Sequence, residues 1–187
     1  MTLDAGEFSA WSDGMRDALL GERDAAVPCG TCTACCTSAQ FIHIAPDETD
    51  TLAHIPAALQ FPAPGLPAGH VVLGYDERGH CPMFVDNACS IYEHRPRTCR
   101  TYDCRIFAAT GVPPEADTLP LIAAQSRRWR FRYASDDDRA EHEALQATAA
   151  AMGAEAAAQG TDVGPVSATG LAVQAARSRL QPPPPTD

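Results

Sequence analysis

The chain has 187 residues, 45% hydrophobic and 20% charged, a composition typical of one globular domain or of one domain plus an appendage. Its formal net charge of -10 disfavours nucleic-acid and anionic-membrane partners, because both require basic surface. The sequence starts without the basic and apolar regions of a secretion signal, and no run approaches the roughly 18 apolar residues that span a bilayer. We therefore expect a cytoplasmic protein.

The first half of the chain is predicted to contain short elements. Apolar residues at helical spacing predict an amphipathic helix over residues 5–20, which Gly21 ends. The patterns that follow predict a strand at 40–44, a helix from 46 to about 53, a loop over 56–69 and a strand at 70–75. Residues 79–92 are predicted to form a hairpin-like excursion that turns at Asp86 and Asn87.

The second half is predicted to be more helical. A helix is expected at 118–126, and a strand at 128–133, where arginines alternate with aromatic residues. Ser135 is a suitable N-cap for a helix over 136–152, which begins with three aspartates. Alanine, glycine and proline then predict a flexible tail, interrupted by one helix over 168–180.

These elements predict an α+β fold: a small, cysteine-rich domain that metal stabilises, with short strands and flanking helices. We expect four parts along the chain. They are an N-terminal helix at 1–27, a metal-binding cysteine-cluster domain at 28–110, a strand and helices packed on that core at 111–152, and a flexible tail rich in alanine, glycine and proline at 153–187.

Eight cysteines in two groups are the most informative pattern: Cys29, Cys32, Cys35 and Cys36, then Cys81, Cys89, Cys99 and Cys104. Reducing conditions favour metal binding over disulfides, and eight thiolates satisfy two tetrahedral centres or one larger cluster. Zinc or iron fits, and so does an iron–sulfur cluster, although Ala39 replaces the fourth cysteine of the ferredoxin spacing. We expect the sulfurs to converge, about 4 Å apart within one tetrahedral set. Side chains of neighbours diverge, so Cys35 and Cys36 are expected to serve different centres or to bridge two.

Charged residues around the second cysteine group suggest supporting roles. Four arginines could form a collar that neutralises thiolate charge: Arg95, Arg97, Arg100 and Arg105. Ordinary surface positions are the alternative for all four. For Asp103, helix capping or pairing with arginine is favoured over iron ligation. His80 and His94 lie beside cysteines, where supporting roles are commoner than ligation.

Two stretches resemble one known family. Residues 29–36 read Cys-Gly-Thr-Cys-Thr-Ala-Cys-Cys, and Cys81-Pro-Met-Phe is followed at 89–100 by Cys-Ser-Ile-Tyr-Glu-His-Arg-Pro-Arg-Thr-Cys-Arg. This order is similar to the CxxCxxCC, or YkgJ-like, bacterial cysteine-cluster proteins, which are described as a zinc- or iron-chelating domain with eight cysteines. The resemblance implies metal chelation. Related longer chains include flagellin lysine methylases.

We therefore predict an intracellular protein that binds zinc or iron through eight cysteines. Two alternatives stay open. One is an iron–sulfur redox or protein-modifying enzyme related to the flagellin lysine methylases, and the other is a metal-stabilised module that binds an unidentified protein partner. The sequence identifies no catalytic residue and leaves open whether the protein is an enzyme.

Overall fold

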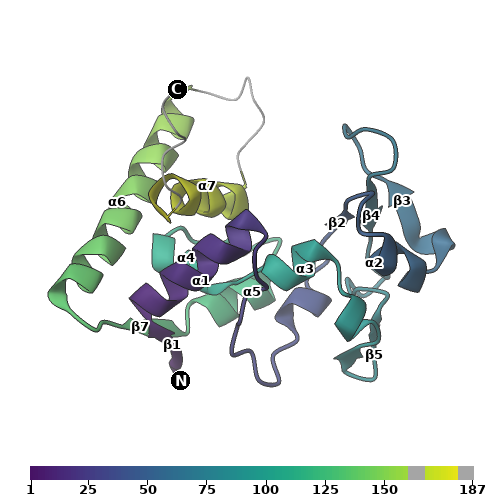
Figure 1. Ribbon diagram of the computed structural model, residues 1–187, viewed down its shortest axis with the longest axis horizontal. Helices are drawn as coiled ribbons and strands as arrows, with labels where there is room; N and C mark the ends of the chain where they lie inside the picture. Colours follow the sequence, from purple (N-terminus) through teal and green to yellow (C-terminus); the bar gives the residue numbers. More distant parts are fainter. Residues whose placement is uncertain (160–166, 181–187) are drawn as a thin grey trace. The chain divides into compact units, whose positions relative to one another are not determined.

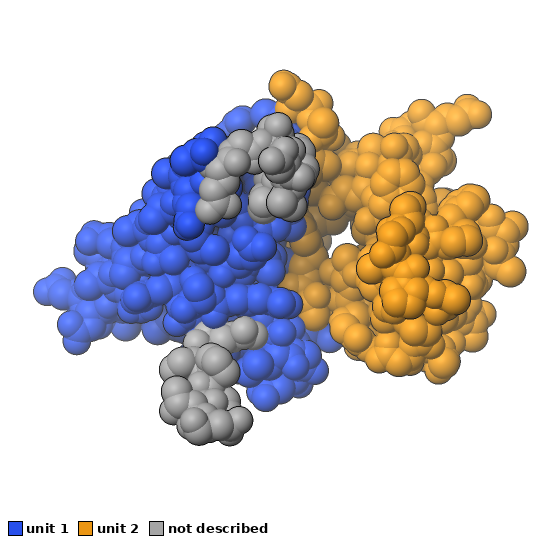
Figure 2. Space-filling model, turned by 90° about the horizontal axis from the view of Figure 1, so that it is seen from above, with its two compact units in different colours: residues 1–28, 103–116, 123–187 blue, residues 29–102, 117–122 orange. Residues whose placement is uncertain are grey.

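The computed structural model describes residues 1–159 and 167–180 (Figure 1). Contacts between residues divide the chain into two units, shown in different colours in Figure 2. The first unit comprises residues 1–28 and 103–116 and the described part of 123–187, and the second comprises residues 29–102 and 117–122. The described residues contain seven α-helices and three small sheets, so the predicted α+β class is confirmed.

The first unit is built from helices and one two-stranded sheet. Its elements are β1 (Leu3–Glu7), α1 (Phe8–Leu20), α4 (Arg105–Thr110), β7 (Trp129–Arg132), α6 (Asp136–Gln159) and α7 (Ala168–Leu180), while α5 (Pro120–Ser126) crosses the division of the chain. Strand β1 pairs in parallel with β7, with Leu3 opposite Trp129. The helix predicted from residue 5 therefore starts later, because residues 5–7 complete β1. Gly21 ends α1 as predicted, in the left-handed conformation (φ 75°).

Aromatic side chains form much of the core of the first unit. Phe8 is fully buried, with its ring stacked on His142 at 4.4 Å between centroids and in edge contact with Phe131 at 5.5 Å. The alternation predicted for the strand is confirmed, because Trp129 is buried whereas Arg130 and Arg132 are exposed. This periodicity directs the aromatic face of β7 into the core.

A buried ion pair fixes the start of α4. Arg105 Nη2 lies 2.7 Å from Asp103 Oδ2, and the guanidinium also donates to the carbonyls of Ala5 and Ala26. Trp11 Nε1 donates to the same carboxylate at 3.0 Å. The pairing role predicted for Asp103 is thus confirmed, and both charges are satisfied despite their burial.

The C-terminal helices extend beyond the predicted core. Helix α6 continues to Gln159, because the alanine-rich sequence after Gly153 has high helix propensity. The helix predicted at 168–180 is present as α7, and it packs against α1, α4 and α6 through buried Ala172, Ala175 and Ala176 (Figure 1). This part of the predicted tail is therefore ordered and packed. Residues 160–166 and 181–187 of the tail lie outside the described residues, and the predicted domain boundaries stay a prediction.

The second unit has much shorter elements. Its strands and helices are β2 (Ile42–Ile44), α2 (Thr49–His54), β3 (Gln60–Pro62), β4 (Val71–Leu73), β5 (Phe84–Val85), β6 (Ala88–Cys89) and α3 (Arg97–Thr101), with 3-10 turns η1 (Ala34–Thr37), η2 (Ala57–Leu59) and η3 (Tyr92–His94). The order β2-β4-β3 is antiparallel throughout. The loop predicted at 56–69 is wrong in part, because it contains η2 and β3.

A small apolar cluster holds this unit together: Ile44, Ile55, Leu73 and Ile91. Two cysteine side chains, Cys81 and Cys89, pack against it and are only partly buried. The cluster therefore positions part of the second cysteine group. None of the described helices combines the length and the apolar character needed to cross a bilayer.

Candidate metal centre

The first cysteine group lies on two consecutive turns. Gly30 has a positive φ of 56°, and the N–H of Cys32 donates to the carbonyl of Cys29 at 3.0 Å. The next turn leads into η1, where the N–H of Cys36 donates to the carbonyl of Thr33 at 2.9 Å. Short turns of this kind carry closely spaced cysteines without requiring a long helix.

The second group begins on a tight hairpin. Strands β5 and β6 pair Phe84 with Cys89, and the turn between them uses Asp86 and Asn87 at φ of 51° and 61°. Two successive residues in the left-handed region are typical of a type I′ turn, so the predicted turn position is confirmed. The hairpin brings Cys89 back toward Cys81.

Backbone hydrogen bonds join the two cysteine groups. The N–H of Cys81 donates to the carbonyl of Cys36 at 2.8 Å, and the N–H of Ala39 donates to the carbonyl of Gly79 at 2.7 Å. Ala39 and Gly79 both have positive φ, at 46° and 78°. A chain segment of 44 residues separates Cys36 from Cys81, and these two bonds close that loop.

A third segment contributes Cys99. Helix α3 begins after Pro96, whose carbonyl accepts the N–H of Cys99 at 2.8 Å. Thr98 Oγ1 donates to the carbonyl of His43 at 2.7 Å, which ties α3 to β2. Local turns, the hairpin and this anchored helix thus place cysteines from three segments within the second unit.

Electrostatic effects show that several thiols lie near one another. Burial, with smaller contributions from Cys81, Cys89, Cys32 and Cys29, raises the pKa of Cys36 to about 11. Burial and the charges of Cys81, Cys36 and Cys89 likewise raise the pKa of Cys99 to about 12. Cys99 is exposed as a residue, although protein atoms crowd its sulfur and make the charged form of the thiol less favourable. Negative thiolates here would repel one another unless a cation lay among them.

Cys81 has backbone N–H groups beside its sulfur. Burial raises its pKa, whereas the N–H groups of Met83 and Phe84 oppose that change by favouring the thiolate. The donors as a set fit zinc or iron, because thiolate sulfur is a soft ligand that suits both metals.

A family model described as "Putative zinc- or iron-chelating domain", named CxxCxxCC, matches residues 28–117. Residues 28–117 are therefore similar to the CxxCxxCC family. The match includes all eight cysteines. The searches of curated proteins and of solved structures returned no match.

The arginines of the CxxCxxCC segment have different environments. Arg95 acts as the predicted collar residue, because its charge lowers the pKa of Cys99 against the larger effect of burial. Its guanidinium also lies 3.7 Å above the Tyr92 ring, and its buried Nε has no hydrogen-bond partner among the described residues. Arg97 instead pairs with Asp47 at 2.7 Å, and Arg105 is held by Asp103 in the first unit. These three arginines are therefore not equivalent.

Cys104 differs from the other seven cysteines of the CxxCxxCC family match. It belongs to the first unit, where it is buried at the N-terminus of α4 and accepts the indole N–H of Trp129 at 3.2 Å. Its predicted role as a metal ligand stays a prediction.

The CxxCxxCC segment also contains a group that the sequence reasoning missed. Asp50, His54 and His94 present ligand atoms that all lie within 4.8 Å of one another. Among the described residues, no three cysteine sulfurs meet that spacing. The predicted separation of about 4 Å is thus not met here, and a shared ion would have to draw the sulfurs together. The i,i+4 spacing of Asp50 and His54 was visible in the sequence, but nothing local connects them to His94.

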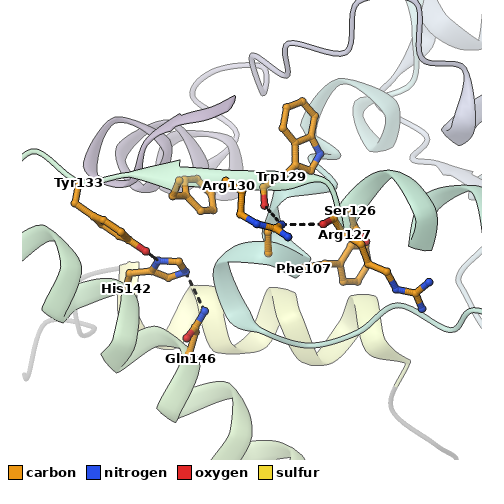
Figure 3. Close-up of a pocket in the computed structure, with 10 residues that line it drawn as sticks. Phe107, Ser126, Arg127, Trp129, Arg130, Tyr133, His142 and Gln146 are labelled. Carbon is orange, nitrogen blue, oxygen red and sulfur yellow. Dashed lines mark hydrogen bonds between the residues drawn. The ribbon is translucent and has the colours of Figure 1, made fainter. Parts of the chain in front are cut away.

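A separate cavity lies outside the cysteine groups, within the first unit. It has a volume of about 290 Å³, and its lining includes Arg127, Arg130, Tyr133, His142 and Gln146 (Figure 3). His142 is held on both sides, by the Tyr133 hydroxyl at 2.8 Å from Nδ1 and by the Gln146 amide at 3.2 Å from Nε2. Arg130 donates to the carbonyls of Arg127 and Trp129. The hydrogen bonds fix the side chains of His142 and Arg130 in the cavity.

Proposed function

We propose that the chain binds zinc or iron through its cysteine thiolates: Cys29, Cys32, Cys35, Cys36, Cys81, Cys89, Cys99 and Cys104. The hydrogen bond from the N–H of Cys81 to the carbonyl of Cys36 carries this proposal, because it joins the two cysteine groups. The family description supports the same class of ligand.

Cys36, Cys81, Cys89 and Cys99 form the proposed heart of the centre, because burial and then the charge of neighbouring thiols in this group raise the pKa of Cys36, Cys81 and Cys99. Cys29 and Cys32 act on Cys36 from the preceding turn. Cys35, which is exposed, and Cys104 complete the proposed set. Zinc would join the segments without redox chemistry, whereas iron would add electron transfer.

Within this proposal, residues of the chain prepare the site before metal arrives. The N–H groups of Met83 and Phe84 favour a thiolate at Cys81, and Arg95 favours one at Cys99. The small apolar cluster fixes Cys81 and Cys89 on one side. Metal binding would release thiol protons and stabilise a unit whose own apolar core is small. Eight thiols are best preserved in the cytoplasm, which we propose as the location.

Anaerobic purification, elemental analysis and visible spectroscopy of the full chain test this function. A zinc centre would be colourless, whereas an iron–sulfur cluster would absorb visible light and decay in air. Replacing Cys36 and Cys81 together by serine should abolish most of the bound metal. Ser12→Ala, in α1 of the first unit, is the matched control and should retain it. Wild-type metal content in the double variant, or a purified chain with neither zinc nor iron, would overturn the proposal.

A further inference from the structure

Two histidines and an aspartate meet on the surface of the second unit. Asp50 and His54 lie one turn apart on α2, and His94 reaches them from η3, which contacts α2. His94 Nδ1 lies 2.7 Å from Asp50 Oδ2, and His54 Nδ1 lies 3.7 Å from Asp50 Oδ1. The carboxylate thus faces one ring nitrogen of each histidine.

The two imidazole rings are stacked almost in parallel, with 3.5 Å between centroids and 5° between planes. If both rings were protonated, two cations would be in direct contact, which is unfavourable. Neutral rings can instead offer lone pairs to one shared ion, and imidazole nitrogen with carboxylate oxygen is a common donor set for zinc. The side chains are 38% to 70% exposed, so an ion can reach them from solvent.

The three residues lie close enough to be drawn onto one tetrahedral ion, because their ligand atoms all lie within 4.8 Å of one another. Metal–ligand bonds of about 2.0–2.1 Å imply about 3.3 Å between two ligands of one tetrahedral zinc ion. The two rings are stacked and face different oxygens of Asp50, so one ring would rotate out of the stack and one carboxylate oxygen would turn toward both nitrogens. The ion would replace the proton between His94 Nδ1 and Asp50 and the proton that His54 Nδ1 donates to the carbonyl of Asp50. Each ring would then carry its proton on Nε2.

We propose that Asp50, His54 and His94 form a second metal site, which takes a divalent first-row transition ion such as Zn²⁺. Nitrogen and oxygen donors distinguish it from the thiol centre, and it does not depend on that centre being correct. Arg100 acts electrostatically on Asp50 and opposes cation binding, so the site should bind more weakly than a thiolate centre. Solvent would occupy the fourth position.

Histidine side-chain NMR of the full ¹⁵N-labelled chain tests the proposal directly, with Zn²⁺ as the probe after the thiols have been saturated. Further Zn²⁺ should shift Nδ1 of His54 and His94 together, while the signals of His43 and His70 stay in place. The latter pair is a suitable internal reference, because His43 Nε2 lies 2.9 Å from His70 Nδ1 in the same unit. If His54 and His94 do not respond, the site does not exist.

Three variants and one control sharpen the test. His54→Gln, His94→Gln and Asp50→Asn should each weaken this Zn²⁺ binding about tenfold or more, as loss of a ligand or its support does. His43→Gln should leave the affinity unchanged. Amide spectra report whether each variant is folded. Unchanged affinity in the folded variants would overturn the proposal, and an equal loss in His43→Gln would show a nonspecific effect instead.

Discussion

The first unit surrounds Phe8 and Trp129 with long helices, whereas the second arranges strands of two or three residues around four buried apolar side chains. The first unit also satisfies its buried charges internally, through Asp103 and Arg105. In the second unit, burial and the charges of neighbouring thiols raise the pKa of Cys99, and Arg95 offsets part of this change. The first unit thus has a larger apolar core than the second, and we expect bound metal to add stability to the second.

Removal of metal should have the largest effect and should separate the two units. We expect a strong chelator to abolish amide-exchange protection at Cys81 and Phe84, because metal would replace the missing apolar core. Protection in α1 should persist, since α1 lies in the first unit. Simultaneous loss of protection in both units would contradict this division.

The adjacent cysteines provide the next test. Cys36→Ser should remove more metal than Cys35→Ser, because Cys36 is half-buried among other thiols whereas Cys35 is exposed. Metal-to-protein ratios of the two purified variants measure the difference. Equal losses would mean that exposure does not distinguish their roles, and the idea that neighbouring sulfurs serve different centres would lose its support.

Core substitution should affect the first unit alone. Phe8→Ala removes a fully buried ring and should lower the free energy of unfolding by about 3–5 kcal/mol. Phe41→Ala, at a 66% exposed position of the second unit, is the matched control and should change it by less than about 0.5 kcal/mol. Urea unfolding followed by tryptophan fluorescence measures both. A loss of metal in Phe8→Ala would show that the two units are energetically coupled.

Much of the fold was predictable because its signals are local. Helical spacing predicted α1, Ser135 predicted the start of α6, and Asp86 with Asn87 predicted the hairpin turn. Strand β1 was missed because its five residues pair in parallel with β7, about 125 residues away in the sequence. This pairing also brings Asp4 Oδ1 to 3.2 Å from Arg132 Nε.

The candidate site was predictable in its residues but not in its arrangement. Cysteine spacing and the resemblance indicated the CxxCxxCC match at residues 28–117, whereas the assignment of Cys104 to a different unit depends on tertiary contacts. The packing of α7, which lies in the predicted tail, was missed for a related reason. The small side chains of Ala172, Ala175 and Ala176 give little hydrophobic signal, yet they allow close helix packing. Truncation after Met152 would remove that packed helix.

A side chain at Gly79 should destabilise the contact that joins the two cysteine groups. Gly79→Ala places a Cβ at φ 78° and 3.2 Å from the Cβ of Ala39, whereas Gly65→Ala has a similar φ of 73° with open space around it. Both should lose about 1–2 kcal/mol from backbone strain, and Gly79→Ala should lose more through the contact. Thermal unfolding and metal retention of the second unit measure this. Equal losses would show that the contact relaxes without cost.

The smallest expected effect is the pH dependence of the first unit. Burial lowers the pKa of His142 from its ordinary value of 6.5, although the carbonyls of Ala108 and Ala109 oppose the change. The unfolded chain therefore binds the proton more readily, so this contribution to stability is complete above about pH 6.5 and is lost as the pH falls. Tryptophan-detected urea unfolding between about pH 5 and pH 7 should show the slope, and His142→Gln should flatten it. An unaltered slope in His142→Gln would assign the pH dependence to another group.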